Sequence, residues 1–174
     1  VIKGPAHLVG YSDGANIALM VAIARPDLVK SIVSIAANFN ADGIVDLPEF
    51  DPAGISDEYR AEYAQMSPDA PETLDAKIAK MHEIWKVEPN IEVADLAQIS
   101  VPTLVLAGDD DVVKHSHSIE LYETLPFGQL GIVPGTSHGL VKEKPELVTA
   151  IIKSFLTDQS YPVTRQPIRR TNPA

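Results

Sequence analysis

Cysteine is absent from the 174 residues, which excludes disulfide bonds, thiolate metal sites and cysteine nucleophiles. Basic residues are scarce, with 14 Lys and Arg against 24 Asp and Glu, so the formal net charge is -10. That charge argues against a nucleic-acid-binding surface and against attraction to anionic membranes. No apolar run approaches the roughly 18 residues that a membrane-spanning helix needs. We therefore expect a cytoplasmic protein with no membrane span and no nucleic-acid partner.

Apolar runs and helical spacing alternate over most of the chain. Branched-residue runs predict buried strands at 6–9, 29–37, 103–108 and 128–135, and helical spacing predicts helices at 15–25, 115–125 and 145–156. Strands that alternate with helices form a parallel sheet. With 45% hydrophobic residues, the chain can bury one well-packed core. We predict an α/β fold with a partial parallel sheet of about four strands flanked by helices.

The middle of the chain interrupts that alternation. Residues 40–98 begin with a stretch rich in Asn, Asp, Gly and Pro, and they contain helical patterns around 59–66 and at 73–86. We expect this segment to be an insertion over one end of the sheet. Residues 158–174 have no hydrophobic periodicity, so we predict a disordered tail with no catalytic role.

The first strand is followed by Gly10-Tyr11-Ser12-Asp13-Gly14, and a helix begins directly after it. A serine in a tight turn between a strand and a helix is a way of presenting a nucleophile. We expect the backbone to be strained at Ser12, and side chains at Gly10 or Gly14 to crowd the turn. The backbone N–H of Asp13 would point to where an oxyanion forms, assisted by the helix dipole.

A serine hydroxyl needs a base, and the base needs a carboxylate to orient it. Three carboxylates, Asp109, Asp110 and Asp111, follow the third apolar strand, and His138 lies in a loop after the fourth. Ligands gather at the carboxyl ends of parallel strands, so these residues are expected near Ser12. Each of the three carboxylates is a candidate for the acid, and one of them could simply cap the turn.

Three motifs together resemble those of the α/β-hydrolase family of esterases, lipases and related enzymes. "HLVGYSDGANIAL" resembles the family's nucleophile elbow, "VPTLVLAGDDDVV" its acid strand, and "VPGTSHGLVKEKPELV" its histidine loop and final helix. The resemblance implies that Ser12 is the nucleophile, His138 the base and Asp111 the acid at the Gly-x-x-Asp position, with Asp110 as the alternative acid. It also implies a core at 1–39 and 99–157 with a helical cap at 40–98, and it implies no metal or organic cofactor.

The resemblance and the serine nucleophile together favour acyl transfer from a small-molecule acyl substrate, in the manner of a carboxylesterase. Hydrolysis of a thioester or of a carbon–carbon bond is the alternative chemistry, and a ligand-binding or catalytically inert protein of the same fold is the alternative class. Tyr11, Met81 and Trp85 are the candidate pocket residues, although Met81 and Trp85 could equally form the cap's own core.

The remaining histidines are expected to be structural. His7 lies in the first strand and His82 on the second helix of the insertion, where a surface role is favoured over substrate contact. His115 and His117 form a His-x-His pair at a helix start without a matching ligand set, so we expect a solvated helix cap and no metal site.

Only nine residues precede Gly10, whereas the nucleophile strand of the resembled family is the fifth of eight. We expect a partial sequence that lacks the amino-terminal strands and the second oxyanion donor, with a minimal form as the alternative. The first strand would then have one unpaired edge, and the chain would self-associate or lie beside the missing half.

Overall fold

Four parallel strands form the centre of the computed structural model, which describes residues 4–46, 48–158, 162 and 164–169. Their order in the sheet is the order in the chain, β1-β2-β3-β4. The strands are β1 (Ala6–Tyr11), β2 (Val29–Ile35), β3 (Thr103–Asp110) and β4 (Gly128–Ser137). The α-helices are α1 (Asp13–Ala24), α2 (Asp57–Met66), α3 (Leu74–Trp85), α4 (Val93–Leu96), α5 (His115–Thr124), α6 (Leu140–Glu143) and α7 (Pro145–Thr157).

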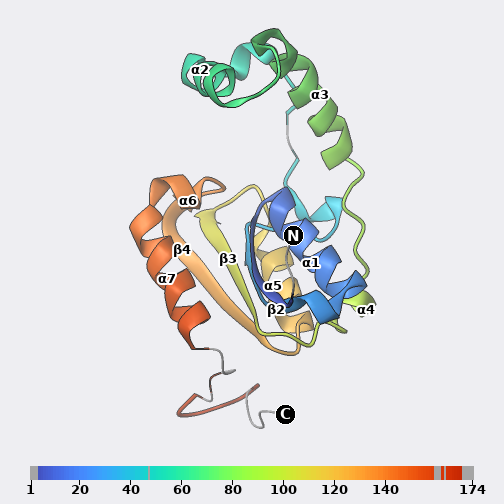
Figure 1. The fold of residues 1–174 in the computed structure, drawn as a ribbon, viewed down its shortest axis with the longest axis vertical. Coiled ribbons are helices and arrows are strands. Elements are labelled where there is room, and N and C mark those ends of the chain that lie inside the picture. The colour runs from blue at the N-terminus through green and yellow to red at the C-terminus, as the bar shows by residue number, and fades with distance from the viewer. Residues whose placement is uncertain (1–3, 47, 159–161, 163, 170–174) are drawn as a thin grey trace.

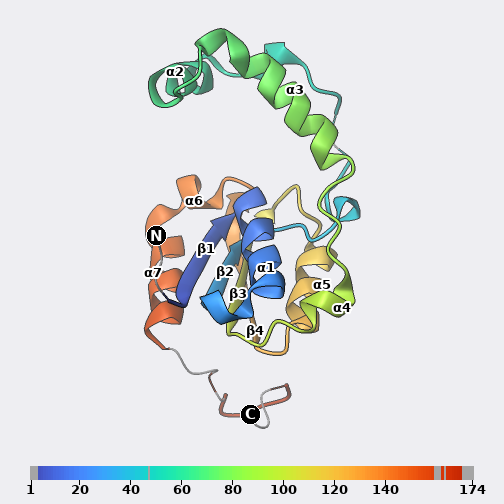
Figure 2. The ribbon, with the colours of Figure 1, turned by 45° about the vertical axis from the view of Figure 1, so that its right-hand side comes forward.

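Helices cover both faces of the sheet because side chains along each strand alternate between the faces. On one face, Ile32 and Val105 pack against α1, α4 and α5. On the other face, Val33 and Leu106 pack against α6 and α7. Figure 2 shows α1 and α5 on one side of the strands and α7 on the other.

β1 occupies one edge of the sheet, and the outer surface beside it is apolar. Val9 on β1 and Ile17 and Met20 on α1 are each more than half exposed. An edge strand carries backbone groups without a strand partner on one side. The position of β1 is the one that the sequence predicted.

The residues between β2 and β3 leave the sheet and return to it. We call α2, α3 and their connection, residues 57–85, the arch; in Figure 1 it stands above the carboxyl ends of the strands. An antiparallel bridge between Asn40 and Asn90 closes its base. Ile91 and Leu96 fall within the predicted cap range, yet they are buried in the core against α1 and α5 because the chain has already returned there.

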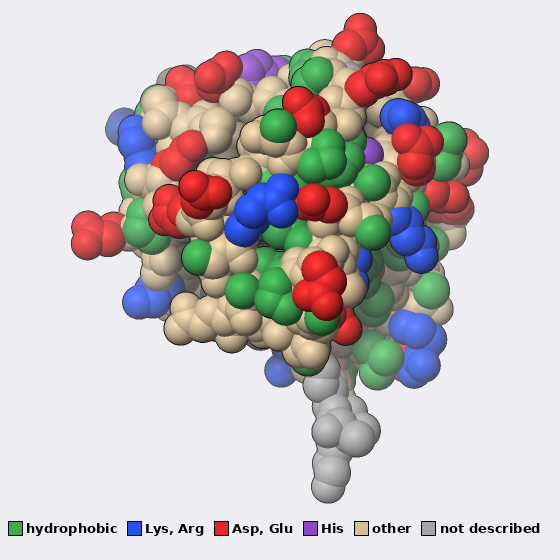
Figure 3. Space-filling view, turned by 90° about the horizontal axis from the view of Figure 1, so that it is seen from above, with side chains coloured by type: hydrophobic (Ala, Val, Ile, Leu, Met, Phe, Trp, Pro, Cys, Tyr) green, Lys and Arg blue, Asp and Glu red, His purple; other side chains and the backbone are tan. Residues whose placement is uncertain are grey.

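The upper surface of the molecule mixes acidic, basic and hydrophobic side chains (Figure 3). Seen from above in Figure 3, acidic side chains are spread over this face among hydrophobic ones, in keeping with the net charge of -10. In the described part of the chain, no helix has the length and apolar character needed to cross a membrane.

Candidate active site

Ser12 lies in a sharp turn between β1 and α1. Its φ of 54° is positive, which is strained for a residue with a side chain. Its N–H donates to Ile35 O at 2.8 Å, and this bond fixes the turn against β2. Gly10 is required, since a Cβ there would lie 2.2 Å from Gly14 O. The expectation for Gly14 was wrong, because a Cβ on that residue meets no atom within 4 Å among the described residues.

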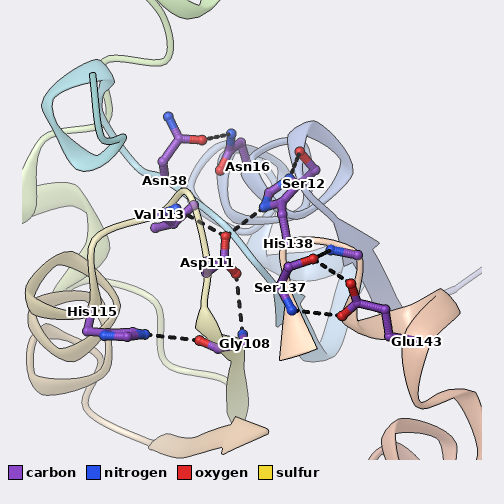
Figure 4. Close-up of polar contacts among 11 residues, drawn as sticks. Ser12, Asn16, Asn38, Gly108, Asp111, Val113, His115, Ser137, His138 and Glu143 are labelled. Carbon is purple, nitrogen blue, oxygen red and sulfur yellow. Dashed lines mark hydrogen bonds and ion pairs between the residues drawn. The ribbon is translucent and has the colours of Figure 1, made fainter. Parts of the chain in front are cut away.

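The structure brings Ser12, His138 and Asp111 into one hydrogen-bonded chain (Figure 4). Ser12 Oγ lies 3.0 Å from His138 Nε2, and His138 Nδ1 lies 2.8 Å from Asp111 Oδ1. An ionised carboxylate can only accept, so Nδ1 carries the proton and Nε2 accepts from the serine hydroxyl. The imidazole therefore faces the serine hydroxyl in the tautomer that could accept its proton.

Asp111 is held as an anion although its side chain is fully buried. Burial by itself raises the pKa of this carboxyl, but hydrogen bonds from His138, Val113 N and Gly108 N, and the charge of His138, lower it below its ordinary value. The backbone donors lie 3.0 Å away at Val113 and 3.3 Å away at Gly108. A buried, hydrogen-bonded anion behind an imidazole both orients the ring and stabilises its protonated form.

His138 has to span the sheet to reach Ser12. β1 and β4 are the two edge strands, so three spacings of about 4.8 Å, roughly 14 Å, separate them. The chain at the end of β4 crosses closely over β3: a Cβ on Gly108 would lie 2.4 Å from both Thr136 O and Ser137 O. The glycine at this position allows the crossing.

Asp13, the candidate oxyanion donor, is the first residue of α1. N–H groups in the first turn of a helix have no partner within the helix, and the dipole favours negative charge beside them. The Asp13 carboxylate accepts a hydrogen bond from Trp85 Nε1 at 3.1 Å. The end of the arch is thereby joined to the residue next to Ser12.

Two of the candidate pocket residues lie beside this site. The Tyr11 ring is 5.4 Å from the His138 ring, and burial, followed by the charges of Asp111 and Glu143, raises the pKa of its hydroxyl. Trp85 also lines a cavity of about 330 Å³ between α3 and the segment after β2. Met81 lies four residues before Trp85 and so shares its helix face, but the described contacts do not place it against the triad.

The two acidic residues that end β3, Asp109 and Asp110, have separate positions. Asp110 is exposed, and Asp109 accepts from Thr136 N at 2.9 Å. The sequence did not indicate a second carboxylate at the histidine turn, Glu143, whose oxygens accept from Ser137. No local sequence pattern predicts this contact, because it depends on how α6 follows the turn.

The expectation of a solvated cap was wrong for His117. That residue is 6% exposed, stacks on Phe39 with ring centroids 3.8 Å apart, and accepts from Phe39 N at 3.0 Å. Burial, with a smaller contribution from Lys114, lowers its pKa to about 4. It is buried because the loop that follows β2 folds over the start of α5.

The three other histidines have ordinary partners. His115 is exposed and donates to Gly108 O, and His7 is exposed on β1 and bonds to Ser31. His82 lies between the Phe50 and Trp85 rings, with centroids 5.2 Å from each. Among the described residues there is no group of three or more His, Asp or Glu side chains placed to hold a metal ion.

Comparison with known proteins identifies the family to which the chain belongs. A family model described as the alpha/beta hydrolase family matches residues 1–151. "Putative carbamate hydrolase RutD" of Caulobacter sp. (strain K31) is 27% identical over 89% of the chain and 66% of its own length. The sn-1-specific diacylglycerol lipase ABHD11 of Mus musculus is 26% identical over 87% of the chain and 59% of its own length.

Solved structures share the fold at low identity. The meta-cleavage product hydrolase CumD of Pseudomonas fluorescens IP01, as a variant complexed with acetates, has a TM-score of 0.71 at 19% identity over 89% of this chain and 65% of that one. The serine hydrolase CarC, involved in carbazole degradation, has a TM-score of 0.68 at 21% identity over 90% and 65%. The chain thus spans less than two thirds of the length of these proteins.

Proposed function

The chain belongs to the alpha/beta hydrolase family, and from that premise we propose that it is a serine hydrolase that cleaves carboxylic ester bonds. The observation that carries the proposal is the continuous hydrogen-bonded chain from Ser12 Oγ through His138 to Asp111. The two curated relatives have names that refer to a carbamate and to a diacylglycerol, and both are carbonyl compounds with a heteroatom leaving group. Their names support acyl transfer as the reaction class.

In the proposed first half-reaction, Ser12 Oγ attacks the ester carbonyl carbon while His138 Nε2 takes the hydroxyl proton. The carbonyl oxygen becomes an oxyanion beside the Asp13 N–H. Collapse of the tetrahedral intermediate breaks the bond to the alcohol oxygen, which receives the proton from His138. An acyl-serine remains.

Water completes the second half-reaction by the same route. His138 takes a proton from water, hydroxide adds to the acyl carbon, and the acid is released as the proton returns to Ser12. Asp111 stays ionised throughout and stabilises the imidazolium that forms twice per cycle.

We also propose that the arch acts as a cap that selects the acyl group. Its support is the Trp85–Asp13 contact, which places an arch side chain one residue from the nucleophile. Tyr11, on the other side of Ser12 in the chain, presents its ring to His138. An acyl chain bound at Ser12 would therefore lie among these aromatic rings, with Met81 on the same helix face as Trp85.

The test is ester turnover by wild type, Ser12→Ala and a control, Ser116→Ala, which changes an exposed serine on α5. A short-chain p-nitrophenyl ester should give a burst of nitrophenolate equal to the number of active sites, followed by steady turnover. Ser12→Ala should lose the burst and several orders of magnitude in rate, because serine and histidine act as a unit. Binding without a burst in the wild type would favour a ligand-binding role, and wild-type turnover in Ser12→Ala would remove Ser12 from the mechanism.

A further inference from the structure

The turn that carries His138 is anchored by two carboxylates that the proposed reaction does not use. Glu143 on α6 accepts from Ser137 N at 2.7 Å through one oxygen and from Ser137 Oγ at 2.6 Å through the other (Figure 4). Asp109, at the end of β3, accepts from Thr136 N at 2.9 Å. The two residues that immediately precede His138 are therefore both held by acidic side chains.

The anchoring extends past the histidine. Ser137 Oγ accepts from Gly139 N at 3.2 Å, so Ser137 ties together the peptide groups on both sides of His138. Glu143 holds Ser137 in turn and fixes the geometry of this turn to α6. Asp109 fixes the same turn to the strand that leads directly into Asp111.

This anchoring matters because the turn must reach across the sheet. His138 starts from β4 and meets a serine that follows β1, roughly 14 Å away across the strands. A small tilt of the turn moves the imidazole by a larger distance at its tip. A misplacement of about 1 Å at a reacting group lowers rates by up to about 10²-fold.

Both carboxylates are in the form that accepts hydrogen bonds. The hydroxyl and N–H of Ser137 lower the pKa of Glu143, and the N–H groups of Gly135 and Thr136 lower the pKa of Asp109. Both side chains are exposed, and exposed interactions contribute little to overall stability. Loss of these hydrogen bonds should therefore lower the reaction rate and leave the folded state intact.

We propose that Glu143 and Asp109 are positioning residues that hold the His138 turn so that the imidazole reaches Ser12 and Asp111 together. The inference rests on the proposed function, since it assigns these residues to the same reaction. Neither side chain touches the substrate or the reacting atoms. They act through Ser137 and Thr136.

The experiment compares Glu143→Ala with Glu143→Gln and with Glu146→Ala, a change to an exposed glutamate in the first turn of α7. Steady-state rates are divided by the burst amplitude, so that only active molecules are counted. Glu143→Ala should lower kcat about tenfold or more with KM and melting temperature nearly unchanged. Glu143→Gln should restore kcat to within about threefold, because its amide oxygen accepts from Ser137 N and its NH2 donates to Ser137 Oγ. Glu146→Ala should match wild type.

Asp109 is tested in parallel with the neighbouring exposed Asp110 as its control. Asp109→Ala should lower kcat in the same manner, while Asp109→Asn, which keeps an acceptor for Thr136 N, and Asp110→Ala should not. If Glu143→Ala fails to fold, Ser137→Ala tests the same link, because it removes the hydroxyl that Glu143 and Gly139 share.

A substrate-free measurement separates this inference from the proposed function. The proton on His138 Nδ1, which is hydrogen-bonded to Asp111, should give a far-downfield proton NMR signal in the wild type. Glu143→Ala should broaden or shift it, and Glu143→Gln should restore it, even if no ester is hydrolysed. An unchanged signal together with kcat within twofold of wild type in Glu143→Ala would overturn the inference. A lower melting temperature and a smaller burst in Glu143→Ala, with an unchanged rate per active site, would also overturn the inference, because that result indicates a merely structural role.

Discussion

Replacing Asp111 by asparagine should nearly abolish hydrolysis, whereas the same change at Asp110 should not. The side chain of Asp111 is fully buried, and its Oδ1 accepts from both His138 Nδ1 and Val113 N while its Oδ2 accepts from Gly108 N. Asparagine has the same shape but no charge, and the NH2 group that replaces one of the two carboxylate oxygens is a hydrogen-bond donor. Whichever way the amide is turned, an N–H then faces a donor group.

The two orientations of the amide damage the site differently. With its NH2 toward His138, the ring is pushed into the tautomer that carries its proton on Nε2, where it can no longer accept from Ser12. With its NH2 toward Gly108, the tautomer survives, but the charge that stabilises the imidazolium is lost. A comparable change in a Ser-His-Asp triad lowers kcat by roughly 10⁴, equivalent to about 5.5 kcal/mol of activation free energy.

Asp110 is the matched control because it neighbours Asp111 in the chain and is exposed. Asp110→Asn should change the rate by no more than about twofold, as expected for a surface substitution. The assay is p-nitrophenyl ester turnover per active site, counted by the burst, with circular dichroism to verify the fold. Equal losses in the two variants, or a larger loss for Asp110→Asn, would refute the assignment of the acid.

Three further outcomes are expected. Burial lowers the pKa of His117 from 6.5 to about 4, so below pH 6.5 the unfolded chain binds a proton more readily than the folded protein does. The free energy of unfolding should therefore be highest above pH 6.5 and fall by about 3 kcal/mol as the pH approaches 4. Thermal melts of His117→Gln should show a flatter pH dependence than those of the wild type, and an equal slope would contradict this. Gly10→Ala should lower the free energy of unfolding by about 3 kcal/mol in denaturant titrations while Gly14→Ala should not, and the reverse order would be inconsistent with the elbow geometry. Trp85→Phe removes the N–H donated to Asp13 and should alter the order in which esters of different acyl chain length are preferred as substrates. Val87→Ala, a change to an exposed residue, is the control and should leave that order unchanged. The same alteration in both variants would show that the Trp85–Asp13 contact has no special role.

The strands and helices of the core could be predicted from the sequence. Apolar runs and helical spacing located β1, β2, β3 and β4 and the helices α1, α5 and α7 to within a few residues of their observed ends. These patterns work because neighbours at two residues in a strand, or three to four in a helix, share a face whatever the rest of the chain does. The alternation of strands with helices also predicted that the sheet is parallel.

The three residues of the candidate site were also named from local motifs, since a strand–turn–helix context surrounds Ser12 and strand ends precede Asp111 and His138. The choice of Asp111 among three adjacent carboxylates came from the family pattern. Its physical basis is visible only in the fold, where the Asp111 side chain is buried and hydrogen-bonded to His138 while Asp110 is exposed.

Other features depended on chain segments far apart in the sequence. His117 looked like a solvated cap residue, but it is buried by Phe39, which lies 78 residues away. The Trp85–Asp13 bond joins residues 72 apart, and the Ser12–His138 bond joins residues 126 apart.

The sequence alone therefore determined which residue types stand at the strand ends, because that information lies within a few residues of each position. The tertiary structure decided which of those side chains meet, because their meeting depends on the sheet order and on the close crossing of the His138 turn over Gly108. Glu143 shows the difference most clearly: its sequence neighbourhood is that of an ordinary surface helix, and only the path of that turn brings it to Ser137.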